Sequence, residues 1–175
     1  MFSILLSAYF LTMSEKTQAE DMIVGIPVSG RHYPGVEKVM GLFRNSLPIR
    51  AKIKQSDSLL EVIKGVYTNC LEAMDHQDFQ TYEIEAALGL NKSLFNTYFI
   101  LQESVEASNF ELGNLEVSTE LIRKNGMFDL KWEFVNQDGV FDAVIEYRDE
   151  LITDNDIKEY KKLYLSVLKK IVGQL

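Results

Sequence analysis

The architecture of this chain can be read outward from two segments, Gly25-Ile26-Pro27-Val28-Ser29-Gly30-Arg31 and Gly41-Leu42-Phe43-Arg44-Asn45-Ser46-Leu47-Pro48-Ile49-Arg50. Together they read as two buried strands joined by a loop. Small residues gather where the first strand ends, at Ser29 and Gly30. Because no bulky Cβ substituent stands there, a ligand or another backbone segment can come close. The sequence therefore predicts a close approach of another backbone segment or of a ligand at this strand end.

Length and composition indicate one folded unit. The chain has 175 residues, of which 46% are hydrophobic and 25% charged, as in ordinary soluble globular proteins. The net charge of −8 and the absence of a basic stripe argue against a nucleic-acid partner. The lone cysteine, Cys70, lies on the apolar side of a helical pattern and cannot form an internal disulfide. It fits a reducing cytoplasm, which is the expected location.

The first residues predict a core helix. Apolar side chains fall at positions 2, 5, 6, 9, 10 and 13, the spacing of one helix face, and the polar residues 14–20 predict a loop. The segment lacks the basic leader and the cleavage site of a signal peptide. No apolar run is long enough to span a bilayer, so no membrane partner is expected.

The middle of the chain alternates strands and helices. Residues 22–28 and 47–53 predict strands, and residues 94–101 a strand buried on both faces. Ser58 and Glu61 have the spacing of a capping box before an apolar helix of about four turns. A short helix is predicted over residues 79–88, closed by Gly89.

The last third predicts consecutive strands and a final helix. Residues 115–121 alternate as a half-exposed strand. Two rows are predicted to face inward and to form a hairpin around residues 137–139: Phe128, Leu130, Trp132, Phe134 and Phe141, Ala143, Ile145, Tyr147. A helix starts at residues 153–156 with acidic residues at its positive end. The predicted fold class is an α/β (α+β) sandwich, a mixed sheet of about five or six strands with helices packed on it.

No complete catalytic or metal site is visible in the sequence. His32 reads as an exposed loop residue and His76 as a helix C-cap, so neither is expected to act as a catalytic base. With one cysteine and two separated histidines there is no soft-ligand cluster, and Asp154 and Asp156 read as helix-start residues. Gly25 and Gly30 lack the strand-to-helix context of a phosphate loop. The sequence therefore predicts no catalytic residue and no metal-binding residue in this chain.

Linked segments resemble, in the same order, the condensation domains of nonribosomal peptide synthetases. The two opening segments are similar to the family's Gly-x-Pro-Val-Ala/Ser-Gly-Arg and Phe-Val-Asn-Thr-Leu-Pro-Leu-Arg signatures. Further matches are Leu5-Leu6-Ser7-Ala8-Tyr9, His76-Gln77-Asp78-Phe79, residues 94–102 and Phe128-Asp129-Leu130. Departures from the usual residues indicate a divergent member: Arg44, Ser46, Gln80-Thr81 and Lys92-Ser93.

The resemblance implies a chloramphenicol acetyltransferase-like fold, in which two lobes enclose a tunnel. The family's His-His-x-x-x-Asp-Gly motif lies in the first lobe and is absent from this sequence. Residues 1–175 are therefore expected to be the C-terminal lobe of a condensation domain, and Met1 within a core-helix pattern favours a truncated piece. The parent would join a carrier-bound acyl or peptidyl thioester to an aminoacyl acceptor through an amide. The isolated chain is expected to be inactive.

The resemblance also implies partners and site residues. The expected partners are the missing N-terminal lobe and peptidyl or acyl carrier proteins, whose phosphopantetheine arms carry the substrates; no cofactor is expected to bind the chain directly. Matched residue by residue, Ser29, Asn45 and Arg31 are the candidate tunnel residues. For Asn45 and Arg50 the alternative is that they satisfy buried backbone groups at strand ends.

Other functions fit the same residues. The chain could be a non-catalytic module that binds carrier domains or associates with itself through an exposed lobe interface. A heterocyclisation domain, or another acyltransferase relative, differs mainly in the absent lobe and stays open. Epimerisation domains carry a tryptophan-bearing segment where residues 42–46 lie, which argues against that relative.

Overall fold

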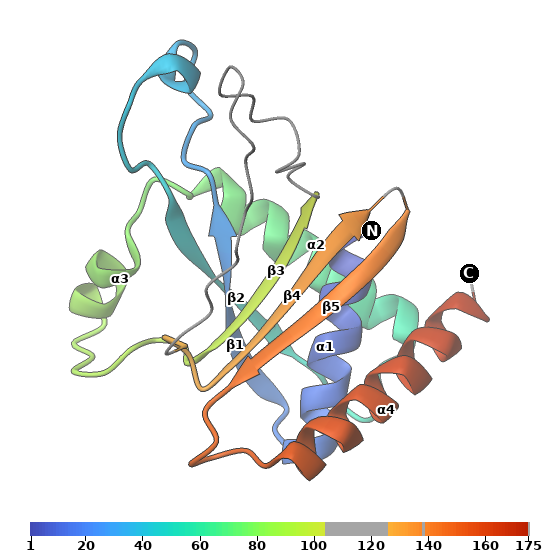
Figure 1. Ribbon diagram of the computed structural model, residues 1–175. Helices are drawn as coiled ribbons and strands as arrows, with labels where there is room; N and C mark the ends of the chain where they lie inside the picture. Colours follow the sequence, from blue (N-terminus) through green and yellow to red (C-terminus); the bar gives the residue numbers. More distant parts are fainter. Residues whose placement is uncertain (104–125, 138, 175) are drawn as a thin grey trace, which may run out of the picture.

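The computed structural model describes residues 1–103, 126–137 and 139–174 (Figure 1). The predicted mixed sheet with helices packed on it is confirmed. The elements in chain order are α1 (Phe2–Thr17), β1 (Asp21–Val28), the 3₁₀ turn η1 (Val36–Lys38), β2 (Asn45–Lys52), α2 (Leu59–Asp75), α3 (Thr81–Ala87), β3 (Thr97–Glu103), β4 (Leu130–Gln137), β5 (Val140–Tyr147) and α4 (Asp154–Val172).

The sheet has five strands in the order β2-β1-β3-β4-β5. The central pairs, β1 with β3 and β3 with β4, are parallel, and the outer pairs are antiparallel. Gly25 stands opposite Tyr98 on β3, and Tyr98 stands opposite Lys131 on β4. Side chains on neighbouring strands at these positions share one face of the sheet.

Helices α1, α2 and α4 pack behind the sheet (Figure 1). Leu130, Trp132 and Phe134 of β4 point into this helical layer and are buried. We call the opposite side, which carries Tyr98, Lys131 and Glu133, the open face. Among the described elements, the helices α1, α2 and α4 lie on the other side of the sheet from this face.

Aromatic side chains join α1, the sheet and α4 into one core. Tyr9 lies 5.6 Å from both Phe99 and Trp132 by ring centroids, and Trp132 lies 4.8 Å from Tyr164. Such rings bury large apolar areas and add specific edge and face contacts. The Tyr164 hydroxyl also donates to the Leu5 carbonyl, 3.1 Å away, which fixes α4 against α1.

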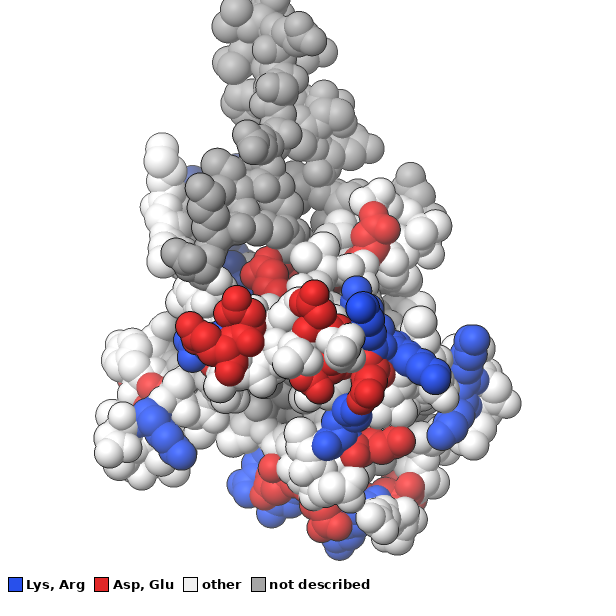
Figure 2. Space-filling view, turned by 60° about the horizontal axis from the view of Figure 1, so that its bottom comes forward, with Lys and Arg blue, Asp and Glu red and all other residues white. Residues whose placement is uncertain are grey.

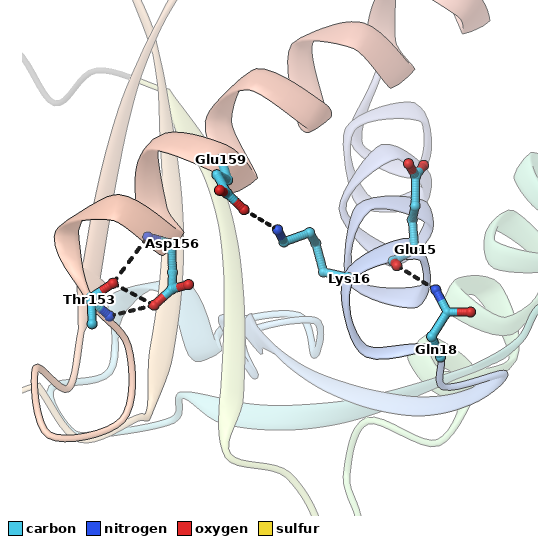
Figure 3. A network of polar contacts seen from close by, with 6 residues as sticks. All are labelled: Glu15, Lys16, Gln18, Thr153, Asp156 and Glu159. Atoms are coloured by element: carbon cyan, nitrogen blue, oxygen red, sulfur yellow. Dashed lines mark hydrogen bonds and ion pairs between the residues drawn. The ribbon is translucent and has the colours of Figure 1, made fainter.

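Both predicted helix starts are confirmed. Ser58 and Glu61 form a capping box at α2, and Thr153 and Asp156 form one at α4. In the second, the Asp156 carboxylate accepts from the Thr153 backbone N–H at 2.9 Å and from its hydroxyl at 2.6 Å (Figure 3). Lys16 near the end of α1 pairs with Glu159 of α4, so the first turns of α4 are tied to α1.

Several local predictions need correction or fall outside the described residues. Phe128, predicted to share the inward row of Leu130, Trp132 and Phe134, instead packs on Tyr98 of the open face, because it precedes β4 and does not follow the alternation of that strand. Helix α1 continues through residues predicted as a loop because their polar side chains face outward, and it ends where Gln18 adopts φ 59°. Ala143 is exposed rather than inward because it is a short side chain on the edge strand β5, while Phe141, Ile145 and Tyr147 do pack on the core. The predicted strand over residues 115–121 lies outside the described residues.

The short helix after α2 is confirmed as α3, and Gly89 follows it with φ 65°. Within the described ranges, no helix combines the length and apolarity needed to cross a membrane. On the face drawn in Figure 2, acidic and basic side chains are interspersed rather than separated into patches of one sign.

Candidate functional site

A groove of about 1010 Å³ opens where β1 ends, and it extends over the open face. Its walls come from the end of β1, the loop before β2, strands β3 and β4, and the residues that precede β4. Its lining includes Ser29, Arg31, Phe43, Tyr98, Phe128 and Lys131. The strand end at which the sequence predicts a close approach therefore borders this groove.

Stacked aromatic rings form the apolar part of the groove. Tyr98 and Phe128 are nearly parallel, at an interplanar angle of 9° and a centroid distance of 4.3 Å. Phe95 packs beside them, 6.1 Å from Tyr98. The Tyr98 hydroxyl also lies 2.7 Å from the Ser46 hydroxyl, so one end of the ring is held by β2. This fixes the orientation of the largest side chain in the groove wall.

A charged cluster forms the polar part of the groove. The Lys131 ammonium lies 2.9 Å from Glu146 and 3.2 Å from Glu133, and Gln102 donates to Glu133 at 2.7 Å. Glu133 is only 7% exposed. A carboxylate at that depth is tolerated because a cation and an amide both face it. The cluster gives the groove a polar part that adjoins its aromatic part, because Lys131 stands opposite Tyr98 on the neighbouring strand.

The loop between β1 and β2 is organised by Arg31. Its guanidinium donates to the carbonyls of Val36, Val39 and Gly41 at 2.6, 2.8 and 2.9 Å. The same group lies over the ring of Phe43, 4.5 Å from the centroid. The planar fork of arginine suits several fixed acceptors at once, and stacking on an aromatic face adds to it. Arg31 therefore holds the loop in one shape beside the groove.

Gly30 makes this loop shape possible. Its φ is 65°, and a Cβ built there would stand 1.9 Å from the Phe43 carbonyl oxygen. A residue with a side chain would have to adopt a left-handed conformation and would clash with the backbone of the returning loop. The predicted close approach at this position is thus made by the chain itself.

Of the three candidate tunnel residues, two line the groove and one does not. Ser29 is exposed and lines the groove, and its hydroxyl accepts from the Arg31 backbone N–H at 3.3 Å. Arg31 lines it too, with its guanidinium committed to the loop. Asn45 is buried and is not among the described lining residues; its amide donates to the carbonyls of Gln77 and Phe79. The Asn45 amide therefore satisfies backbone carbonyls of the connection between α2 and α3.

The Arg50 side chain does not satisfy buried backbone groups; it binds a carboxylate instead. Its guanidinium forms two hydrogen bonds, of 2.7 and 2.6 Å, with the exposed carboxylate of Asp21. Its backbone carbonyl accepts from the Asn69 amide. The Asp21 carboxylate has a pKa below its ordinary value because Arg50 donates to it. The pair joins β1 to β2 at the end of the sheet distant from the loop.

The two histidines lie outside the groove. His32 faces Asp78, with its Nε2 atom 3.2 Å from the carboxylate, and His76 is the C-cap of α2, as predicted. Neither is a lining residue. Among the residues that the structure describes, no three His, Cys, Asp or Glu side chains gather as metal ligands. Burial raises the pKa of the Cys70 thiol to about 11, which disfavours the nucleophilic thiolate.

Sequence reasoning did not single out Tyr98, Lys131, Glu133 or Glu146 as groove residues. Each alternates with core residues along β3, β4 or β5, so its place on the open face follows from the two-residue period. That signal was present in the sequence. The pairing of β3 with β4, which brings the side chains together, was not, because it depends on tertiary structure.

Comparison with known proteins gives the family. The family model described as "Condensation domain" matches residues 1–175. Gramicidin S synthase 2 of Brevibacillus brevis is 27% identical over 99% of this chain, and tyrocidine synthase 3 of Brevibacillus parabrevis is 31% identical over 99%. The chain spans 4% and 3% of these two proteins. Each relative is thus many times longer than the matched region.

Solved structures show the same fold. A four-domain nonribosomal peptide synthetase bound to AMP and glycine matches with a TM-score of 0.86 at 17% identity, over 98% of this chain and 15% of that chain. The first condensation domain of the calcium-dependent antibiotic synthetase, in complex with a substrate analogue, matches with a TM-score of 0.70 at 15% identity. That match covers 95% of this chain and 37% of the solved one. The chain belongs to the condensation domain family of nonribosomal peptide synthetases.

Proposed function

We propose that residues 1–175 are the C-terminal lobe of a condensation domain that forms amide bonds. The observation that carries this proposal is the groove beside Ser29, in a chain that the family matches along its whole length. The length of the chain also supports the proposal, since the chain covers 37% of one solved condensation domain and 41% of another. The first lobe, with the His-His-x-x-x-Asp-Gly motif, would supply the opposite wall.

The groove would act by positioning two substrates. The acceptor amine nitrogen attacks the carbonyl carbon of the donor thioester, the C–N bond forms, and the C–S bond breaks to release the donor thiol. Holding these atoms close and aligned removes much of the entropic barrier. Ser29 and the loop fixed by Arg31 would form one rim, and Tyr98 and Phe128 an apolar wall that excludes water. The histidine that handles the proton would come from the first lobe.

Carrier proteins would deliver both substrates on phosphopantetheine arms, in the cytoplasm. A four-domain nonribosomal peptide synthetase is among the solved structures that share this fold, which supports this partner class. The chain itself would hold no cofactor. Its part would be to receive the arm and to orient the acyl and aminoacyl groups that the arms carry.

The test blocks the groove at its rim. Ser29→Trp, made in the chain joined to a first lobe, should lower amide formation between carrier-bound donor and acceptor by about a hundredfold, because the indole fills the passage that positions the amine. Ser56→Trp is the matched control, because Ser56 is also exposed and is not a groove residue. Equal rates for the two variants would contradict a tunnel at Ser29.

An apolar stripe on α2 supports a second candidate, a non-catalytic module that binds carrier domains or associates with itself. Leu60, Tyr67 and Leu71 lie on one side of the helix and are 51, 53 and 46% exposed. Exposed apolar residues that lie together mark interaction surfaces. Sedimentation of the chain at increasing concentration tests self-association: a dimer that Leu71→Glu abolishes supports it, and a monomer at all concentrations contradicts it.

A further inference from the structure

The loop that forms one rim of the groove is tied to the connection between α2 and α3. The Tyr33 hydroxyl donates to one carboxylate oxygen of Asp78 at 2.6 Å, and His32 Nε2 lies 3.2 Å from the other. The His32 and Tyr33 rings are in contact, with centroids 4.2 Å apart and planes tilted by 39°. A single carboxylate thus meets two successive side chains of the loop.

The segment that carries Asp78 is itself held rigidly. The amide of Asn45 donates to the carbonyls of Gln77 and Phe79, the residues on either side of Asp78, at 2.9 and 2.7 Å. Asn45 is only 6% exposed, so water does not readily replace these bonds. The Thr81 hydroxyl adds a bond of 2.7 Å to the carbonyl of Ser46. Asp78 is therefore presented to the loop from a fixed backbone.

The same loop carries the groove rim. His32 and Tyr33 directly follow Arg31, whose guanidinium sets the course of the chain to Gly41 and stacks on Phe43. Both Arg31 and Phe43 line the groove. Arg31 fixes the loop internally, whereas Asp78 fixes it against the rest of the lobe.

We propose that Asp78 is a positioning residue that keeps the groove rim in its binding-competent place through Tyr33 and His32. This inference rests on the proposed function of the groove. If the rim were free, only a fraction of molecules would hold it correctly, and the apparent affinity for the acceptor would fall by that fraction. The contact of Asp78 with Tyr33 has its own signature, because it raises the pKa of the Tyr33 phenol above its ordinary value.

The first test measures the loop in the 175-residue chain. Asp78→Ala should speed hydrogen exchange of the Val36 and Val39 amides at least about tenfold, while amides of α4 stay unchanged. It should also lower the pKa of Tyr33, followed by NMR of the tyrosine ring. Asp75→Ala is the control, because Asp75 is an exposed carboxylate nearby with no polar contact to another described side chain. Tyr33→Phe, which removes one oxygen, should reproduce the faster loop exchange.

The second test uses the chain joined to a first lobe. Asp78→Ala should raise KM for the carrier-bound acceptor about tenfold with kcat nearly unchanged. Asp78→Asn, which keeps an oxygen that can accept from Tyr33, should lie between Ala and the unchanged protein. Unchanged loop exchange and KM in Asp78→Ala would overturn the inference alone. Absence of amide formation in the unsubstituted two-lobe protein would refute the proposed function, and the exchange measurement would still decide the role of Asp78.

Discussion

Gly25 lies directly against the ring of Phe95. A Cβ built on Gly25 would stand 2.2 Å from Cε2 and 2.6 Å from Cδ2 of that ring, far inside the contact distance of two carbon atoms. Gly25 pairs with Tyr98 across the junction of β1 and β3, and Phe95 packs on Tyr98. The glycine therefore makes room for the aromatic wall of the groove.

Gly25→Ala should destabilise the fold. Phe95 and Tyr98 would have to move together, and we expect the free energy of unfolding to fall by about 1–3 kcal/mol. Gly65→Ala is the matched control, since a Cβ there meets nothing within 4 Å and the residue lies inside α2. That variant should gain about 0.5–1 kcal/mol from helix propensity. Denaturant unfolding measures both, and a neutral Gly25→Ala would contradict the packing described.

Arg31→Lys should loosen the loop although the charge is kept. A lysine ammonium cannot reach three separate carbonyls and stack on Phe43 at once, so we expect a loss of about 1–2 kcal/mol of unfolding free energy. Arg44→Lys, a neighbouring exposed arginine, should change it by less than about 0.5 kcal/mol. Equal effects of the two substitutions, measured by denaturant unfolding, would show that the fork geometry of Arg31 does not matter.

Thr153→Ala removes the side-chain cap of α4. The Asp156 backbone N–H would lose its acceptor, so the free energy of unfolding should fall by about 1 kcal/mol. Thermal unfolding at a fixed pH measures this. Thr17→Ala serves as the control because its exposed hydroxyl lies at the C-terminal end of α1, where it donates to the Met13 carbonyl and accepts from the Ala19 N–H and so caps no helix N-terminus. A loss no larger than that of the control would contradict the cap.

Acid should weaken the fold through three carboxylates. The pKa values of Asp21, Glu61 and Asp156 are lowered by hydrogen bonds from Arg50, Ser58 and Thr153 respectively. Because the folded pKa lies below the unfolded one, the stabilisation is complete above the unfolded pKa of about 4 and is lost as the pH falls through the folded pKa.

Unfolding free energies measured between neutral pH and about pH 2 should decline only at the acidic end. Asp156→Asn removes one of the three titrating groups, so its decline should be shallower than that of the unsubstituted chain. A decline of the same steepness in both proteins would mean that Asp156 makes no contribution to the acid sensitivity.

Much of the fold is visible locally in the sequence. The apolar spacing after Met1, the capping residues Ser58 and Thr153, and the alternation around Trp132 each predict an element that the structure confirms. These signals work because helix and strand periods differ, and because cap side chains satisfy amides that the first helical turn leaves free.

The arrangement of the site could be predicted from the sequence only in part. Arg31 reads in the sequence as the end of a signature, yet its three acceptors lie further along a loop that has no periodic pattern. Asn45 was a candidate tunnel residue, and only the position of residues 77 and 79 shows which groups its amide meets. Contacts of this kind depend on long-range packing, which local residue patterns do not encode.

The most direct test of the account compares amide formation by residues 1–175 alone and by the same residues joined to a first lobe that carries the His-His-x-x-x-Asp-Gly motif. Both preparations receive the same carrier-bound thioester and carrier-bound aminoacyl acceptor, and the product on the acceptor carrier is measured by mass spectrometry. We predict no product from the chain alone and steady product from the two-lobe protein. Turnover by the isolated chain, or none by the joined protein, would contradict the proposal that this chain forms one wall of a shared catalytic cleft.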